Sequence, residues 1–190
     1  MSDKRTAILE ATLRVIVRGG VNAVRYREVA AEAGVALGTI SYQYPAREEL
    51  IRSAFEHYLA KTMVSLRALA DTIDIRKPED LARLLVDAIL VDFADPDKMY
   101  LVENELVLYA ARDPALAEAY TAWDRSLVAQ LGEIVERVGG TSPFSIAQTL
   151  LELTRGFSFA ALIQKEPDFE DFKKRVTRIV SALFPAPETP

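Results

Sequence analysis

Apolar residues recur along this chain at steps of three and four, which is the spacing of one face of an α-helix. In the first segment, about 3–18, the residues that share one face are Ile8, Leu9, Leu13, Ile16 and Val17. Gly19 and Gly20 follow, and glycine is favoured where a helix ends. The alternation typical of a β-strand is not persuasive in any segment, so the pattern predicts an all-α protein.

Two short helices are expected next, at about 27–33 and 37–44, on either side of a turn that begins at Gly34. The second must end by Pro45, because the residue before a proline avoids the helical region. A much longer helix is then expected over about 46–71. The order of elements in this part is therefore one amphipathic helix, two short helices and one long helix.

Prolines and glycines divide the rest of the chain into further helices. They are expected over about 78–95, between Pro96 and Pro114, and over about 114–138, 143–165 and 168–184. The helix at 114–138 carries a single apolar stripe with steps of three and four residues.

The helix at 143–165 has a different pattern, because from Leu150 to Ile163 it is apolar on nearly all sides. A helix that is apolar on two sides must be buried on two sides. In a chain of this length the second side is most simply covered by a second copy related by a two-fold axis. The interface residues expected on this helix and the last one are Leu150, Phe157, Ala160, Ile163, Val176, Ile179, Val180 and Leu183.

The two short helices around Gly34 have the arrangement of a helix-turn-helix motif. In that motif the second helix enters the major groove of DNA and presents side chains to base edges. Val35 and Ile40 are expected to face inward and fix the two helices together. The residues left for the outward face are Leu37, Gly38, Thr39, Ser41, Tyr42 and Gln43. Glutamine can form two hydrogen bonds with adenine, so Gln43 is a candidate for base recognition.

The distribution of charge agrees with DNA binding at the N-terminal end. Seven of the 23 Lys and Arg and four of the 28 Asp and Glu lie in residues 1–47, a balance of +3. The rest of the chain has a balance of −8. Such an asymmetry suggests that the basic end faces a polyanion. The absence of cysteine, of a signal peptide and of a membrane-spanning run favours a cytoplasmic protein that does not enter a membrane.

Residues 6–59 closely resemble the DNA-binding domain of TetR-family transcriptional regulators. The resemblance rests on the first helix ending in RGG, on RYREVAAEAGV, on GTISYQY, and on REEL at the start of the long helix. It implies an all-helical homodimer that binds a palindromic operator in double-stranded DNA, usually as a repressor, and releases it when a small molecule binds the C-terminal domain. The expected domains are a three-helix helix-turn-helix domain at 1–47 and a helical-bundle domain for ligand binding and dimerisation at 48–190, joined by the helix at about 46–71.

The resemblance also implies which residues contact DNA. They are Arg25, Tyr26, Arg27, Leu37, Gly38, Thr39, Ser41, Tyr42, Gln43 and Arg47, whereas Tyr44 is expected in the core. Ala36 stands where the family often has Ser or Thr, so a helix cap worth about 1 kcal/mol is missing. Gln43 stands where the family frequently has His, so the operator sequence cannot be carried over from a relative.

A ligand site in the C-terminal part would be mostly apolar, as pockets between bundle helices usually are. The candidates are Met63, Phe93, Tyr100, Tyr109, Tyr120, Trp123 and Phe157, and the expected ligand is small and largely apolar. An alternative stays open, in which a DNA-binding regulator of this fold responds to a protein partner or to no ligand.

An enzyme is not expected, because the sequence shows no nucleophile–base pair, no metal-ligand spacing and no phosphate-binding loop. His57 is the only histidine and cysteine is absent, so neither a metal nor a cofactor is expected. His57 is interpreted as a surface or hinge residue.

Overall fold

The computed structural model describes residues 2–184, with Ser2 and Asp3 described by their backbone alone. Within that range the chain forms nine α-helices and one short 3-10 helix, without a β-strand. The prediction of an all-α protein is therefore confirmed. No helix among these residues has the length and apolar character needed to cross a membrane.

The chain divides into two compact units. The first contains the residues up to Met63 together with Asp95–Ala122, and the second contains Val64–Ala94 together with the chain from Trp123 onward. Two long helices, α4 (Arg47–Thr72) and α7 (Pro114–Arg137), contribute residues to both units. These units are defined by how densely their residues pack. The boundary expected at residue 47, between a DNA-binding domain and a ligand-binding domain, remains a prediction.

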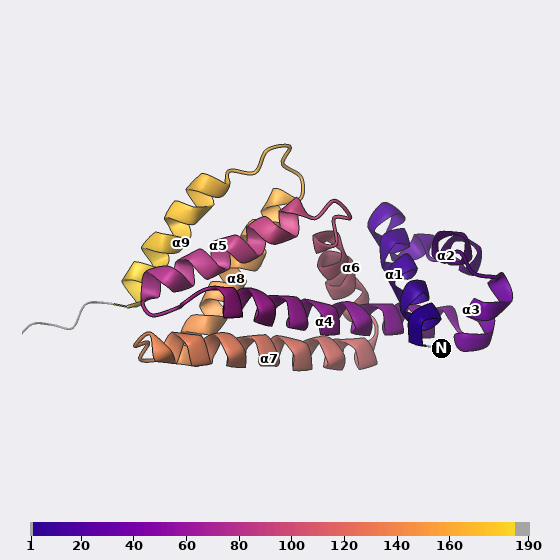
Figure 1. Ribbon diagram of the computed structural model, residues 1–190, viewed down its shortest axis with the longest axis horizontal. Helices are drawn as coiled ribbons and strands as arrows, with labels where there is room; N and C mark the ends of the chain where they lie inside the picture. Colours follow the sequence, from indigo (N-terminus) through magenta and orange to yellow (C-terminus); the bar gives the residue numbers. More distant parts are fainter. Residues whose placement is uncertain (1, 185–190) are drawn as a thin grey trace, which may run out of the picture. The chain divides into compact units, whose positions relative to one another are not determined.

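The first unit begins with the helices expected from the sequence (Figure 1). They are α1 (Ser2–Gly19), the 3-10 helix η1 (Val21–Ala23), α2 (Tyr26–Ala33) and α3 (Leu37–Gln43). The helix η1 was not expected, because three residues are too few to show a period. The unit also contains α6 (Tyr100–Ala110), which packs against α1.

The core of the first unit is formed by apolar residues from each of these helices. Ile8 on α1, Val29 on α2 and Ile40 on α3 are all 0% exposed. Tyr44 is 4% exposed, so its predicted place in the core is confirmed. Phe55 on α4 and Leu106 on α6 are fully buried as well. The short helices α2 and α3 are thus held by packing, because helices of their length are marginal in isolation.

The second unit is a bundle that contains α5 (Pro78–Ala94), α8 (Pro143–Ala161) and α9 (Phe169–Leu183). Helix α5 packs against both α8 and α9 (Figure 1). The largest side chains of its core include Leu81 and Phe172, both 0% exposed. Helix α8 ends at Ala161, four residues before the end expected from the sequence at 165.

Four residues expected at a subunit interface lie inside the second unit instead. Leu150 and Val176 are 0% exposed, Val180 is 1% exposed and Phe157 is 9% exposed, so they are not available to a partner. The prediction was wrong for these four, because a helix that is apolar on two sides does not reveal which side faces its own core. Of the other expected residues, Ala160 and Ile163 are exposed, whereas Ile179 and Leu183 are half-buried.

Candidate nucleic-acid interface

The turn between α2 and α3 depends on the backbone conformation of Gly34. This residue ends α2 with φ 65° and ψ 33°, in the left-handed region. A Cβ atom at this position would meet nothing within 4 Å, so glycine is favoured by conformation and not by space. The next amide, that of Val35, donates to the carbonyl oxygen of Ala30 at 3.0 Å, and the chain then enters α3.

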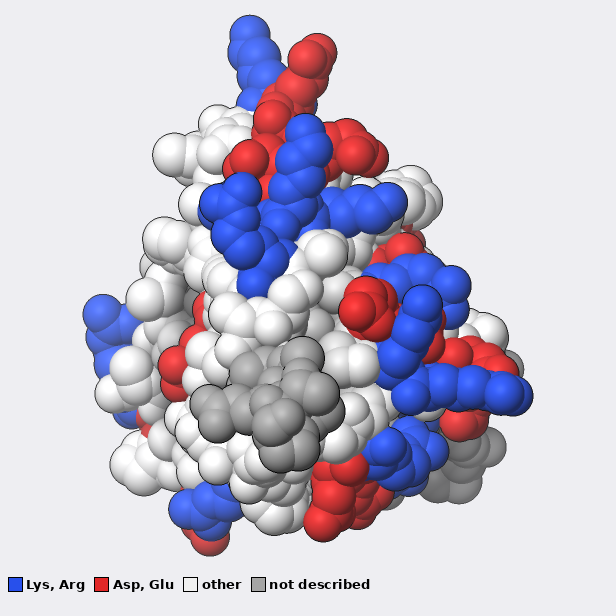
Figure 2. Space-filling view, turned by 90° about the vertical axis from the view of Figure 1, so that its left-hand side faces the viewer, with Lys and Arg blue, Asp and Glu red and all other residues white. Residues whose placement is uncertain are grey.

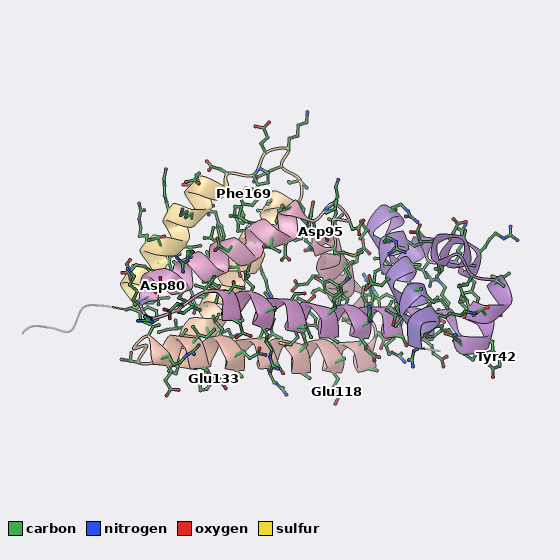
Figure 3. The ribbon with its side chains drawn as sticks, in the orientation of Figure 1. Tyr42, Asp80, Asp95, Glu118, Glu133 and Phe169 are labelled. Atoms are coloured by element: carbon green, nitrogen blue, oxygen red, sulfur yellow. The ribbon has the colours of Figure 1, made fainter. Side chains whose placement is uncertain are left out.

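Helix α3 exposes the face that the sequence assigned to DNA. Tyr42 is 87% exposed and projects from the helix into solvent (Figure 3). Leu37 is 49% exposed, and Gly38 and Ser41 are exposed as well. Thr39 and Gln43 are half-buried at the edges of this face. A helix with one core residue and several accessible polar groups can lie against another surface without losing its own packing.

Two polar side chains of α3 are directed toward the chain itself. The hydroxyl of Ser41 lies within hydrogen-bond distance of the carbonyl oxygens of Leu37, at 3.4 Å, and Gly38, at 3.3 Å. The Oε1 atom of Gln43 is buried and has no hydrogen-bond partner among the described residues. A double hydrogen bond to adenine uses both amide atoms, so Gln43 has to turn outward before it can read a base in that way.

The start of α3 lacks a side-chain cap, as the sequence predicted. Ala36 is the residue before the helix, with φ −68° and ψ 143°, and no side chain there accepts a hydrogen bond from the first turn. The carbonyl oxygen of Ala36 accepts from the amide of Thr39 at 2.9 Å. No side chain therefore accepts from the first-turn amides of α3, which have no partner from the preceding helical turn.

Tyr26, an expected DNA contact, connects α2 with the end of α3. Its hydroxyl donates to the main-chain carbonyl oxygen of Tyr44 at 2.5 Å. Burial, and then the negative charges of Glu48 and Glu49, raise the pKa of Tyr26. The half-buried ring therefore has a structural role in addition to any contact with DNA.

Arg47, also an expected DNA contact, has its guanidinium group bound to the chain's own backbone. Nη2 donates to the carbonyl oxygen of Val21 at 2.6 Å, and Nε donates to that of Val24 at 2.7 Å. The charge is also 3.8 Å from Glu48. This side chain fixes the first residue of α4 to the link between α1 and α2. Because the guanidinium group is already bound, the main-chain amide of Arg47 is the group better placed to contact a phosphate.

Arg25 and Arg27 differ from Arg47 in being exposed. Arg25 precedes the first residue of α2 and has extended backbone angles, φ −127° and ψ 142°. Neither arginine forms an ion pair within the part of the chain that the structure describes. Both guanidinium groups are thus free to contact phosphate, which is the role expected for them.

Other charged residues of this unit hold its helices together. Glu32 on α2 accepts hydrogen bonds from Arg14 Nε and Arg18 Nη2, each at 2.6 Å. These two bonds lower the pKa of Glu32. The spacing of the two arginines, one helical turn apart on α1, is the sequence signal for such a pair.

His57 connects α4 with α1. Its Nε2 atom lies 2.8 Å from Glu10 Oε1, which also accepts from Lys61 Nζ at 3.0 Å. Burial raises the pKa of Glu10, but hydrogen bonds from His57 and Lys61 outweigh it and lower the pKa overall. His57 is thus a half-buried residue between two helices.

The residues expected at a ligand site are distributed over the two units. In the first unit, the ring of Tyr109 lies 6.0 Å from that of Phe55, and the hydroxyl of Tyr120 donates to Glu103 at 3.2 Å. Met63 and Tyr100 are half-buried there. All four residues belong to the first unit, where Tyr109 and Tyr120 already have partners.

In the second unit, Phe157 stacks on Phe172 with ring centroids 3.9 Å apart, and Phe93 meets Phe169 edge to face at 5.4 Å. Trp123 is buried, with the guanidinium carbon of Arg155 5.6 Å from its ring centroid. Arg155 Nη1 also lies 2.6 Å from Asp124 Oδ1, a charged pair that the sequence did not reveal.

Two family descriptions match separate parts of the chain. Residues 8–54 match "Bacterial regulatory proteins, tetR family", and residues 76–186 match "Tetracyclin repressor-like, C-terminal domain". The first match covers the helix-turn-helix motif described above, and the second covers α5 to α9.

Individual proteins show the same likeness. The chain is 22% identical over 144 residues to the uncharacterized HTH-type transcriptional regulator YerO of Bacillus subtilis, which covers 72% of this chain and 50% of that protein. It is 26% identical over 113 residues to the HTH-type nicotine-responsive transcriptional repressor HdnoR of Paenarthrobacter nicotinovorans, over 59% of this chain and 57% of that one. The chain thus spans only about half the length of these curated relatives.

Among solved structures, a TetR-family transcriptional regulator from Rhodococcus sp. superposes with a TM-score of 0.75 at 26% identity. The superposition covers 96% of this chain and 99% of that one. The similarity therefore extends through both parts of the fold.

Proposed function

This chain belongs to the TetR family of bacterial regulatory proteins, and we propose that it is a transcriptional repressor that binds a palindromic operator and is released from it by a small molecule. The observation that carries the proposal is the exposed face of helix α3. Its one fully buried residue, Ile40, fixes the helix to the unit, while Tyr42 is 87% exposed on the opposite face. An exposed aromatic and polar helix face, in a unit that also exposes Arg25 and Arg27, is suited to the major groove.

The proposed contacts divide into those that read bases and those that hold the phosphate backbone. Thr39 and Tyr42 face the bases, Gln43 reads a base once its buried amide has turned outward, and Arg25 and Arg27 hold phosphates. The full proposed set is Arg25, Tyr26, Arg27, Leu37, Gly38, Thr39, Ser41, Tyr42, Gln43 and Arg47. Within it, Tyr26 and the side chain of Arg47 also fix the positions of α2 and α4 through the hydrogen bonds described above.

A palindromic operator requires two copies of the motif, so we place a second copy of the chain on the exposed apolar residues at the C-terminal end of α8 and in the turn that follows it. On α8, Ala160 is exposed and Phe159 is 67% exposed, and in the turn Ile163 is 92% exposed, which is unusual for large apolar residues. Figure 2 shows one face of the chain, on which the charged side chains of Lys, Arg, Asp and Glu lie beside uncharged residues. The two recognition helices of such a dimer must lie about 34–36 Å apart to reach successive major grooves.

The proposed signal is a small, largely apolar ligand bound in the C-terminal part. Support comes from HdnoR, which is described as nicotine-responsive, and from the aromatic residues Trp123, Tyr100 and Tyr120. The candidates for contact with the ligand remain those expected from the sequence, with Met63, Tyr100, Tyr109 and Tyr120 in the first unit and Phe93, Trp123 and Phe157 in the second. To release the operator, the ligand must bind the DNA-free state more tightly than the DNA-bound state, since equal affinity would shift nothing.

The proposal is tested by selecting duplexes from a random-sequence pool with the purified protein. Wild type should enrich a palindrome whose half-site centres lie about one helical turn apart. The variant Tyr42→Ala, which removes an exposed side chain without opening the core, serves as the comparison and should enrich it far less. A pool that shows no enriched sequence with the wild type would reject the proposed function.

A further inference from the structure

The link between α1 and α2 is held by a carboxylate from α6. Glu105 Oε2 accepts a hydrogen bond from the main-chain amide of Val21 at 3.3 Å. Val21 is the first residue of η1, and the amide of a first helical residue has no acceptor within its own helix. Glu105 therefore provides the acceptor that the turn lacks. Its helix lies within residues 76–186, outside the DNA-binding match at 8–54.

Gly20 makes room for this carboxylate. A Cβ atom at Gly20 would lie 3.3 Å from Glu105 Oε1 and 3.4 Å from Oε2, closer than most Cβ contacts. Gly20 also has φ 70° and ψ 177°, a region that only glycine adopts readily. The Glu105 carboxylate thus lies where the Cβ atom of any other residue at position 20 would come close to it. The backbone conformation of this turn favours glycine as well.

The opposite side of the same turn is held by Arg47. The carbonyl oxygen of Val21 accepts from Arg47 Nη2 at 2.6 Å, while its amide donates to Glu105. Both polar groups of one residue are therefore used by charged side chains from α4 and α6. From this residue the chain continues through Val24 and Arg25 directly into α2, so the orientation of η1 sets where α2 begins.

We propose that Glu105 is a positioning residue for DNA binding, which holds η1 in the orientation that α2 and α3 need at the operator and so makes operator affinity depend on α6. The inference rests on the proposed function. The inference predicts that removing the Glu105 carboxylate lowers the affinity for DNA, whereas electrostatics alone would raise it. Removing a carboxylate near a phosphate-binding surface should strengthen DNA binding, whereas removing a positioning contact should weaken it.

The test compares Glu105→Ala and Glu105→Gln with Glu118→Ala, which removes an equal charge from an exposed position on α7. Fluorescence anisotropy would follow binding to the duplex selected by the wild type and to a scrambled duplex of equal composition. Glu105→Ala should bind the selected duplex about tenfold more weakly, and the scrambled duplex no more weakly than wild type does. Glu105→Gln should retain most of the affinity, since its amide oxygen can accept the same hydrogen bond. Glu118→Ala should bind like the wild type.

A second measurement separates positioning from general stability. Hydrogen exchange at the Val21 amide should be faster in Glu105→Ala than in the wild type, with little change in melting temperature. The inference would be overturned if Glu105→Ala lost the same affinity for both duplexes and its melting temperature fell. It would also be overturned if Glu105→Ala bound the selected duplex as tightly as the wild type does. A wild type that does not distinguish the two duplexes would instead overturn the proposed function, and this inference with it.

Discussion

The hydroxyl of Tyr26 on α2 donates a hydrogen bond to the main-chain carbonyl oxygen of Tyr44 at the end of α3, at 2.5 Å. This bond joins the two helices of the motif at the end opposite to the turn at Gly34. The angle between α2 and α3 is therefore fixed at two places, and the exposed face of α3 is held in a defined orientation. The variants below test this arrangement and the contacts around it.

Tyr26→Phe should lower the free energy of unfolding by about 1 kcal/mol, because it leaves a partly buried carbonyl group without its donor. The pKa of Tyr26 is raised above its ordinary value of 10.0 in the folded chain. The protonated hydroxyl therefore contributes fully to stability below pH 10.0. This contribution is lost as the pH rises through the higher pKa of the folded chain. Wild type should thus lose more stability than Tyr26→Phe at alkaline pH. Chemical denaturation at several pH values measures this, with the exposed Tyr42→Phe as the control.

Glu32→Gln should destabilise the first unit by about 1 kcal/mol at neutral pH, because it weakens the bonds to Arg14 and Arg18. The pKa of Glu32 lies below its ordinary value of 4.5, so its contribution is present above that value and disappears as the pH falls through the lower one. The difference between wild type and variant should shrink in acid. Glu28→Gln, an exposed change on the same helix, should show no such difference at any pH.

Arg47→Ala should weaken operator binding without changing its dependence on salt. The guanidinium group is engaged by the carbonyl oxygens of Val21 and Val24, so its loss disturbs the position of α2 and removes no phosphate contact. Arg27→Ala, by contrast, should lower the slope of log affinity against log salt concentration by about one. Titrations at several salt concentrations separate the two. A lower slope for Arg47→Ala would place its side chain on DNA.

Ile163→Asp should convert a dimer into monomers, because it introduces a charge into the proposed apolar contact. Ile163 is 92% exposed in the single chain, so the monomer itself should keep its stability. Val91→Asp, at a 60% exposed position on α5, provides a matched control that should remain dimeric. Sedimentation equilibrium measures the state. A wild type that is monomeric at micromolar concentration would refute the proposed interface.

Local signals predicted most of the helices. Glycine and proline mark helix ends through their own backbone geometry, so Gly34 and Pro45 placed the ends of α2 and α3 within a residue or two. The outward face of α3 followed from the single core position Ile40. These features depend on neighbouring residues, which is why the sequence alone was enough.

Contacts between distant segments could not be predicted in the same way. Val21 and Glu105 are 84 positions apart, and Val21 and Arg47 are 26 apart, so neither contact leaves a periodic signal. An exposed arginine and one bound to backbone carbonyl groups look alike in a sequence, so the hydrogen bonds from the guanidinium group of Arg47 to Val21 and Val24 could not be predicted. Leu150 and Val176 were misplaced because apolar character does not distinguish a core from an interface.

The central claim, sequence-specific DNA binding through α3, is tested most directly by one ratio of affinities. Fluorescence anisotropy at physiological salt would compare wild-type binding to the duplex selected from the random pool with binding to a scrambled duplex of equal composition. The account predicts at least about 10³-fold tighter binding to the selected duplex, as specific regulators show over non-specific DNA. Equal affinity for the two duplexes would contradict it.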